Sequence, residues 1–381
     1  MSDQMVSMPG IWRVGAAVLV GGLLLASTAP PSRAQTAVNG LWVANSGGPT
    51  VPQFSAGQTS KVSVTSPKPT LINMSGSFFS PQDTVFDSHN NLWVVDGGDG
   101  TGDTTEGVFM FTGAQLRSLR TDDSPTPTFA ITNSGGVPGF VFPQFGVFDR
   151  LGNLYVADPG VDVIFVFSAA QLSSGSGTGL VPAAVFQISG STGILGLAFN
   201  KGNLYLADNG AAQIFVVNSA HIPTSGGTVG SPTPVSADVT LSSNHNGTFA
   251  SIDGPWSLVF DAAGDLWFSN EGIILNSGPS VVEFAASSLT ASGTPTPATQ
   301  FTPLTTRVGV TIADPQGVSL NNLGDLSVSN DANNSIAIFR AGQLKGSGAV
   351  NPGTFLIGAA TTLNAPTGLI FGPNFGRPHS R

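Results

Sequence analysis

Four carboxylates gather in one short, glycine-rich segment of the chain. They are Asp96, Asp99, Asp103 and Glu106, and neither Lys nor Arg interrupts the segment. Carboxylate oxygens are the ligands that Ca²⁺ prefers, and glycines permit the turns that aim several oxygens inward. The segment therefore predicts a Ca²⁺ site, although its spacing does not match an EF-hand loop. The alternative is an acidic hairpin that is merely solvated.

A histidine and a glutamate form a second candidate site. His245 lies in a long polar stretch ahead of Asp253-Gly254-Pro255-Trp256, and Glu271 follows the next strand-like run. Histidine is the commonest acid–base residue near neutral pH, and a carboxylate completes an acid–base pair. We expect both side chains on the same face of the fold. The alternative is a surface histidine without a chemical role.

The composition excludes several classes of function. The 381 residues include 13 Lys and Arg against 22 Asp and Glu, which gives a net charge of −9, and charged residues make up only 9%. The few basic residues are scattered, so the chain lacks the basic surface that nucleic-acid binding requires. The sequence contains no cysteine, which excludes disulfides, thiol nucleophiles and thiolate metal sites. Motifs for Ser-His-Asp catalysis, phosphate cradles and zinc are also absent from the sequence.

A repeat defines the elements that must position the candidate residues. Six similar segments, each apolar and ending in Asp or Asn, occupy residues 41–45, 92–96, 154–158, 204–208, 266–270 and 326–330. The steps between their leucines are 51, 62, 50, 62 and 60 residues. Such periods, with β-branched and aromatic runs between Gly and Asn turns, are typical of propeller blades.

Each repeat contains four predicted strands. In one copy they cover residues 146–149, 154–158, 163–167 and 183–188. The strands are apolar at both odd and even positions, so we expect both faces of each sheet to be buried between neighbouring sheets. The aromatic residues at one equivalent position should pack there; they are Trp42, Trp93, Tyr155, Tyr205 and Trp267. The Asp or Asn that ends each second strand should bond to nearby turn backbone.

The two ends of the repeat region complement each other. The first copy, residues 41–45, lacks a first strand, and residues 368–371 form an orphan first strand at the other end. Pairing of these N- and C-terminal strands would close the ring and remove exposed sheet edges. The sequence therefore predicts an all-β fold, a six-bladed β-propeller of four-stranded antiparallel blades.

The units resemble those of NHL-repeat propellers and, more loosely, of gluconolactonase-type and streptogramin B lyase propellers. The resemblance rests on the Gly-Asn-Leu-Tyr-Val-Ala-Asp pattern and covers nearly all of residues 39–371. It implies the fold. Streptogramin B lyases use His and Glu with Mg²⁺, which implies roles for His245 and Glu271, although Glu271 stands one place later than in the lyase pattern. Gluconolactonase-type enzymes hold a central divalent metal with Glu, Asn and Asp, for which this chain offers only Asp83 and amides.

In such propellers the starts of the inner strands line the mouth of the central channel. The aligned positions hold Gln82, Gln144, Trp256 and Gln316, and Asp83 is the only charge in the next ring of residues. Glutamine amides and an indole ring suit a polyol or sugar ligand.

Two of the hairpins between the second and third strands are enlarged. The separation runs from the Asp or Asn that ends the second strand to the last residue of the third strand. It is 9 residues in four repeats, 15 between residues 96 and 111, and 14 between residues 270 and 284. These repeats are three blades apart, so we expect the two hairpins to face each other across the channel mouth. Long loops on a rigid scaffold are where functional sites usually lie.

Residues 1–34 are predicted to be a signal peptide. Arg13 precedes the apolar residues 14–26, and Ser32-Arg33-Ala34 offers a cleavage site. The apolar run is shorter than the ~20 residues that span a bilayer. An uncleaved membrane anchor is the alternative. We expect residues 35–371 to form the propeller, residues 372–381 to be a frayed tail, and the protein to be exported to the periplasm or the extracellular space.

These observations predict an exported binding or scaffold module, with a small-molecule or protein ligand at the channel mouth. We expect no nucleic-acid partner and no membrane span after the signal is removed. The alternative is a metal-dependent lactonase or lyase of the gluconolactonase or streptogramin B lyase type. Titratable groups that could act as acid–base pairs are sparse, and this favours binding.

Overall fold

The structure is a computed structural model that describes residues 40–73, 78–102, 105–120, 123–174, 177–244, 249–306 and 309–373. Residues 37–381 form one compact unit, to which all described residues belong. The predicted signal peptide, and the predicted tail after residue 373, lie outside the described residues.

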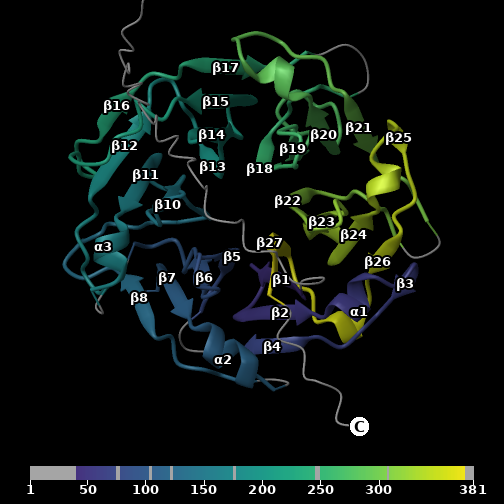
Figure 1. Ribbon diagram of the computed structural model, residues 1–381, viewed down its shortest axis with the longest axis horizontal. Coiled ribbons are helices and arrows are strands. Elements are labelled where there is room, and N and C mark those ends of the chain that lie inside the picture. The colour runs from purple at the N-terminus through teal and green to yellow at the C-terminus, as the bar shows by residue number, and fades with distance from the viewer. Residues whose placement is uncertain are drawn as a thin grey trace, which may run out of the picture. The chain divides into compact units, whose positions relative to one another are not determined.

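Six sheets form a ring, which Figure 1 shows along its axis, and we number them as blades in ring order. Blade 1 contains β27 (Pro366–Gly372), β1 (Gly40–Asn45), β2 (Thr50–Phe54) and β4 (Thr70–Asn73). Blade 2 contains β5 (Pro81–Phe86), β6 (Leu92–Asp96), β7 (Gly107–Phe111) and β8 (Phe129–Thr132). Blade 3 contains β9 (Phe145–Phe148), β10 (Leu154–Asp158), β11 (Val163–Phe167) and β12 (Ala184–Ile188).

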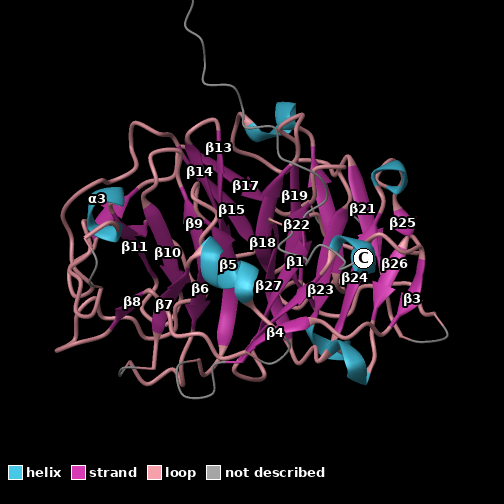
Figure 2. Cartoon of the chain, turned by 60° about the horizontal axis from the view of Figure 1, so that its bottom comes forward, coloured by secondary structure: helices cyan, strands magenta, loops and turns pink. Residues whose placement is uncertain are grey.

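Blade 4 contains β13 (Ile194–Asn200), β14 (Asn203–Asp208), β15 (Gln213–Val217) and β17 (Val239–Ser242). Blade 5 contains β18 (Pro255–Phe260), β19 (Leu266–Asn270), β20 (Ser280–Phe284) and β21 (Thr299–Thr302). Blade 6 contains β22 (Pro315–Leu320), β23 (Leu326–Asn330), β24 (Ser335–Phe339) and β26 (Thr354–Leu356). Figure 2 shows the strands of neighbouring blades standing side by side. The predicted fold, a six-bladed propeller of four-stranded antiparallel blades, is confirmed.

The ring closes between the two ends of the repeat region. Strand β1 pairs antiparallel with β27, and Leu41 lies opposite Phe371 while Val43 lies opposite Leu369. The predicted pairing of N- and C-terminal strands is therefore confirmed. Strand β27 runs one residue beyond the predicted end of the propeller, to Gly372.

The hydrophobic core is divided among the gaps between blades. Each of six apolar clusters joins residues from two neighbouring blades, and together they go around the whole ring. The five repeated aromatic residues are all buried within these layers, as predicted. Because burial of one large apolar side chain contributes about 1.5–3 kcal/mol, face-to-face packing of blades is the main source of stability.

The loops of each blade lie at two opposite ends of its strands. Hairpins between second and third strands form one end, which we call the hairpin face. The turns between first and second strands form the other end, which we call the helix face. Its short helices follow the third strands; they are α1 (Ala56–Thr59), α2 (Gly113–Ser118), α3 (Ala169–Leu172), η1 (Ala286–Leu289) and η3 (Ala341–Gln343).

A capping box starts several of these helices. Ser168 caps α3 and Gln171 bonds back to the cap, and Thr112 with Gln115 does the same for α2. The pattern of Ser or Thr followed three residues later by Gln satisfies backbone donors at both positions. No helix in the described part of the chain has both the length and the apolar character needed to cross a membrane.

The connectors between third and fourth strands cross to the preceding blade, a feature that the sequence analysis did not predict. Three of them add a fifth, parallel strand there: β16 (Thr233–Val235) on β12, β25 (Gly348–Ala349) on β21 and β3 (Ser63–Thr65) on β26. The others form isolated hydrogen bonds without a strand, such as the bond from the Gly179 backbone N to the Thr132 carbonyl at 2.9 Å. We call these segments cross-blade connectors. They tie each blade to its neighbour at the outer edge of the ring.

Candidate functional site

The hairpin face places the starts of the inner strands beside the second-to-third-strand hairpins. Strand pairing is shifted at the start of several inner strands, between Pro81 and Asp83 and again between Pro255 and Leu258. A bulge at the rim of a sheet re-aims side chains and ends regular pairing. Because of these shifts, side chains that a regular strand would direct between the blades face the mouth of the channel.

Glu271 and Trp256 are joined at the mouth, although the sequence analysis assigned them to different sites. The Trp256 indole Nε1 donates to Glu271 Oε2 at 3.0 Å, and Asn209 Nδ2 donates to the same oxygen at 3.3 Å. Asn209 belongs to the blade 4 hairpin and Glu271 to the blade 5 hairpin. The contact thus brings two neighbouring blades together around one carboxylate.

Two further carboxylates, both from blade 6, are within electrostatic range of Glu271. Asp314 immediately precedes β22, and Asp331 begins η2 (Asp331–Asn333). Burial, and then the charges of Glu271 and Asp331, raise the pKa of Asp314 to about 6. The pKa of Asp331 is raised by burial and then by Glu271. The three groups therefore repel one another, and a positive charge among them would be stabilised.

Gln316 completes this group of residues. Its Nε2 donates to Asp331 Oδ2 at 3.3 Å, which places the amide against the carboxylates. Its Oε1 is buried and has no hydrogen-bond partner among the described residues. A buried amide oxygen without a partner costs free energy that a ligand donor would recover. We call Trp256, Glu271, Asp314, Gln316 and Asp331 the mouth cluster.

The other predicted ligand-binding residues, Gln82, Asp83 and Gln144, are also buried. Gln82 is 4% exposed and donates to Ser80 Oγ, whereas Gln144 has a buried Oε1 without a partner among the described residues. Asp83 Oδ2 accepts from the Gly146 backbone N at 3.1 Å, and burial raises the pKa of Asp83 to about 8. A Cβ built on Gly368 would lie only 2.1 Å from Asp83 Oδ1. Asp83 therefore links three blades at the axis.

A buried aspartate anchors the enlarged hairpin of blade 5. Asp253 accepts from the backbone N atoms of Leu275 at 2.7 Å and Ser277 at 3.0 Å, and from the Ser277 hydroxyl at 2.7 Å. Its side chain is fully buried. This anchoring fixes the loop that follows Glu271, and so helps to hold the Glu271 carboxylate at the mouth.

The enlarged hairpin of blade 2 lies on the opposite side of the ring, where Figure 1 shows β6 and β7 across from β19 and β20. Asp96 is buried and accepts from the backbone N atoms of Phe79, Ser80 and Gly98. Burial raises its pKa to about 6. Asp96 therefore anchors loop backbone, as do the residues that end the other second strands.

Glu106 and Asp99 differ in how they sit within that hairpin. Glu106 Oε1 accepts from the backbone N atoms of Thr101 at 3.1 Å and Gly102 at 3.0 Å, while its Oε2 is buried without a partner among the described residues. Asp99 is exposed and bonds to Thr101. Asp103, like His245, lies outside the described residues. Asp96 and Glu106, two of the four predicted Ca²⁺ ligands, are thus both buried at the hairpin.

Asn209, Asp314 and Asp331 were not predicted from the sequence as site residues. A signal for Asp314 was present, because it stands directly before the proline that opens an inner strand, near the position that Asp253 occupies in blade 5. Asn209 directly follows the Asp that ends its second strand. Their convergence with Glu271 depends on the contact between blades, which the sequence of a single repeat does not contain.

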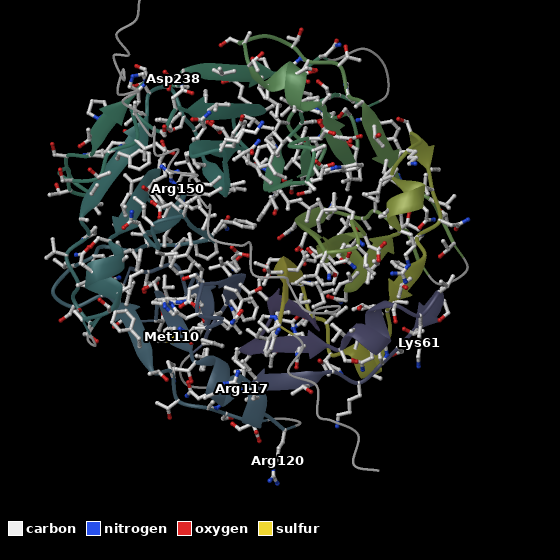
Figure 3. All side chains as sticks on the ribbon, viewed as in Figure 1. Lys61, Met110, Arg117, Arg120, Arg150 and Asp238 are labelled. Atoms are coloured by element: carbon white, nitrogen blue, oxygen red, sulfur yellow. The ribbon has the colours of Figure 1, made fainter. Side chains whose placement is uncertain are left out.

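Charge is distributed unevenly between the two faces. The mouth cluster lies on the hairpin face, whereas the described Lys and Arg residues all lie in segments of the helix face and its connectors: Lys61, Lys68, Arg117, Arg120, Arg150, Lys201, Arg340 and Lys345. Lys61 and Arg120 reach outward at the rim of the ring in Figure 3. Within the described part of the chain, no Lys or Arg therefore compensates the mouth carboxylates.

No protein-family model and no curated protein sequence matches the chain. Solved structures do match its fold. A chain of a nidogen/laminin complex has a TM-score of 0.52 at 12% identity, over 88% of this chain and 99% of that one. A functionally unknown protein from Desulfotomaculum acetoxidans DSM 771 has a TM-score of 0.50 at 14% identity, with 88% and 99% covered.

Streptogramin B lyase is a looser match, with a TM-score of 0.42 at 12% identity, over 71% of this chain and 69% of that one. At such identities a likeness shows the fold alone, because one fold supports many activities. The chain is a six-bladed β-propeller, and its function has to be argued from its own mouth cluster.

Proposed function

We propose that this propeller is a binding module whose channel mouth takes a small hydroxylated ligand with a positive charge, such as an amino sugar. The observation that carries the proposal is the mouth cluster, in which the charges of Glu271, Asp314 and Asp331 act on one another without a compensating Lys or Arg among the described residues. An ammonium group satisfies such carboxylates.

The remaining groups of the mouth cluster suit the hydroxylated part of such a ligand. The Gln316 Oε1 needs a hydrogen-bond donor, and the Trp256 ring offers an apolar surface beside its anchored Nε1. Aromatic rings and a few placed polar groups are the usual lining of small-ligand sites. The predicted signal peptide adds the proposal that binding takes place outside the cytoplasm.

The alternative enzyme, a metal-dependent lactonase or lyase, fits the mouth less well. A catalytic metal needs several ligand atoms that converge on one point. Among the described residues, one group of three acidic side chains brings such atoms within 4.8 Å of one another, and it consists of Asp261, Asp265 and Glu283 on the helix face. The mouth carboxylates do not converge in this way, so binding is the function that the geometry supports best.

Ca²⁺ in the enlarged hairpin of blade 2 remains a separate proposal. It is supported by the buried Glu106 Oε2, which lacks a partner among the described residues, and by the nearby Asp96, whose pKa is raised by burial and by the Glu106 charge. A cation between the two carboxylates would bind the Glu106 Oε2 and would offset the repulsion between Glu106 and Asp96.

The proposed ligand class can be tested by titration calorimetry with glucosamine, with uncharged N-acetylglucosamine for comparison. We expect glucosamine to bind and N-acetylglucosamine to bind at least about tenfold more weakly. Glu271→Gln should remove most of this difference, whereas Glu283→Gln, the same change on the helix face, should preserve it. Equal binding of the two sugars, or an equal effect of the two variants, would contradict the proposal.

A further inference from the structure

One turn on the helix face departs from the pattern of the other blades. In blades 2, 3, 5 and 6 an Asp or Asn opens the turn between first and second strands, and its side chain accepts from the backbone N atoms two and four residues later. Asp149, for example, accepts from Leu151 at 2.8 Å and Asn153 at 2.9 Å. Blade 4 shortens this turn by one residue, with Asn200 directly paired to Asn203.

The shorter turn leaves the Asn200 side chain without this function. Lys201 and Gly202 form the turn with φ values of 51° and 86°, as a two-residue hairpin requires. No hydrogen bond engages the Asn200 amide within the described part of the chain. The amide is thus available to a group outside the turn.

The aromatic residue at the equivalent position of each blade is hydrogen-bonded to this turn in some blades only. In blade 2 the Trp93 indole Nε1 donates to Asp87 Oδ2 at 3.1 Å, whereas the Trp267 Nε1 of blade 5 is buried without a partner among the described residues. Tyr205 is the equivalent residue in blade 4, and burial alone raises its pKa. Its hydroxyl has no partner among the described residues, although 94% of the residue's surface is buried.

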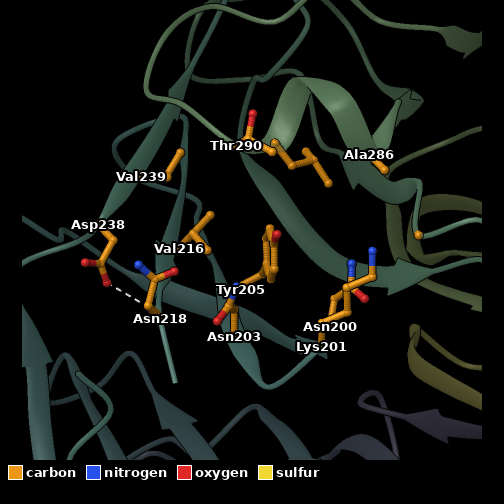
Figure 4. A pocket seen from close by; sticks show the side chains of 12 residues that line it. Asn200, Lys201, Asn203, Tyr205, Val216, Asn218, Asp238, Val239, Ala286 and Thr290 are labelled. Carbon is orange, nitrogen blue, oxygen red and sulfur yellow. Dashed lines mark hydrogen bonds between the residues drawn. The ribbon is translucent and has the colours of Figure 1, made fainter. Parts of the chain in front are cut away.

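Asn200 and Tyr205 line one cavity of about 440 Å³ between blades 4 and 5. Figure 4 shows Lys201 beside Asn200 at one end, Tyr205 in the middle and Asp238 at the other end. Helix η1 of blade 5 provides the opposite wall, with Leu289 as its apolar residue. The volume is in the range of small-ligand sites.

One end of this cavity carries a cation without a counter-ion among the described residues. No carboxylate lies within 4.0 Å of the Lys201 ammonium group among the described residues, which contain ion pairs only at His221–Asp238 and Asp325–Arg340. Asp238 already accepts from the Asn218 backbone N at 2.7 Å and contacts His221 Nδ1 at 2.7 Å. The Lys201 end of the cavity therefore offers an ammonium without a carboxylate partner among the described residues, beside an amide and a hydroxyl that can each donate or accept.

We propose that this cavity binds a small hydroxylated carboxylate, a sugar acid, with its carboxylate against Lys201 and its hydroxyls toward Asn200 and Tyr205. One ammonium suits a single negative charge. The apolar side chain of Leu289 would cover the carbon skeleton. The site lies on the helix face, so it does not depend on the function proposed for the mouth cluster.

Titration calorimetry with glucuronate tests the proposal, and glucose is the uncharged comparison. We expect glucuronate to bind saturably and glucose to bind at least about tenfold more weakly. Lys201→Met should weaken glucuronate binding by about tenfold or more, whereas Lys345→Met, a matched change away from the cavity, should leave it unchanged. No glucuronate binding, or equal binding by the two lysine variants, would overturn the proposal.

Tyr205→Phe provides a second test that removes only the unpartnered hydroxyl. We expect weaker glucuronate binding with an unchanged melting temperature, because the ring still fills its place between the blades. Wild-type affinity in this variant would contradict the assigned role of Tyr205. Glucose 6-phosphate distinguishes the anion class, and tighter binding of this phosphate than of glucuronate would overturn the choice of a carboxylate.

Discussion

Carboxylates in this protein have two roles that residue type alone does not separate. Asp96, Asp158 and Asp208 are fully buried and accept backbone N–H groups of their own blades. Glu271 and Asp314 instead come together at the mouth. The predicted bonding of the repeated acids to nearby turn backbone is confirmed, whereas a functional role for Glu271 stays a prediction. The sequence analysis did not predict that Glu271 would meet Trp256.

Asp83 makes the stability of the ring sensitive to pH. Burial raises its pKa from 3.8 to about 8, so the folded protein keeps a proton that the unfolded chain has lost between these values. This contribution to stability is fully present below the unfolded pKa and is lost as pH rises toward 8. We expect the melting temperature of wild type to fall between about pH 6 and pH 8 more steeply than that of Asp83→Asn, and the two slopes to agree above pH 8.

Asp99→Asn is the control for this effect. Asp99 is exposed, and its hydrogen bonds to Thr101 lower its pKa, so it carries the same charge in both states above pH 6. Its variant should show the wild-type slope. Parallel melting curves for wild type and Asp83→Asn would show that Asp83 does not titrate in this range.

Hairpins and connectors show how far the sequence predicts single elements. The extra residues of two hairpins were visible as altered spacing within a strict repeat, and their places across the ring follow from blade order. The cross-blade connectors were not visible, because two- or three-residue parallel bridges such as β25 on β21 have no hydrophobic period. The contacts of Arg340 could not be predicted either, because they join two blades. Its guanidinium bonds to Asp325 in its own blade and to the Thr59 carbonyl in the connector of blade 1.

The enlarged hairpin of blade 2 is expected to gain stability from Ca²⁺. An ion that binds only the folded hairpin raises the melting temperature as its concentration increases. The triple variant Asp99→Asn, Asp103→Asn and Glu106→Gln should lose this response. Thermal melts with added CaCl₂, compared with NaCl at equal ionic strength, measure the effect. If Ca²⁺ shifts the wild type no further than the variant, the hairpin is only an acidic loop.

At the scale of the whole molecule, stability and function depend on the closed ring. The repeat and its incomplete ends predicted the number of blades and the pairing of β1 with β27. The difference in charge between the two faces could not be predicted. The Lys and Arg residues are scattered along the sequence, and the direction of each strand decides on which face they lie. The strand directions of the propeller therefore place the mouth carboxylates on one face and the described Lys and Arg residues on the other.

Removal of residues 366–381 should open the ring. The deletion exposes one edge of β1 and removes Leu369 and Phe371 from the layer between blades 6 and 1. With the half-buried Ile370, the lost burial amounts to about 5 kcal/mol or more, comparable with the whole stability of a domain. We expect aggregation or a much lower melting temperature. A truncated protein that melts with wild type would show that β27 does not close the ring.

The central claim is that the channel mouth on the hairpin face is a ligand site. Hydrogen exchange measured by mass spectrometry, with and without saturating glucosamine, tests it directly, because ligand contact slows local opening. We predict protection in the mouth segments: residues 252–257, 270–278, 313–316 and 331–334. Protection confined to the helix face, or no protection at saturation, would contradict the account.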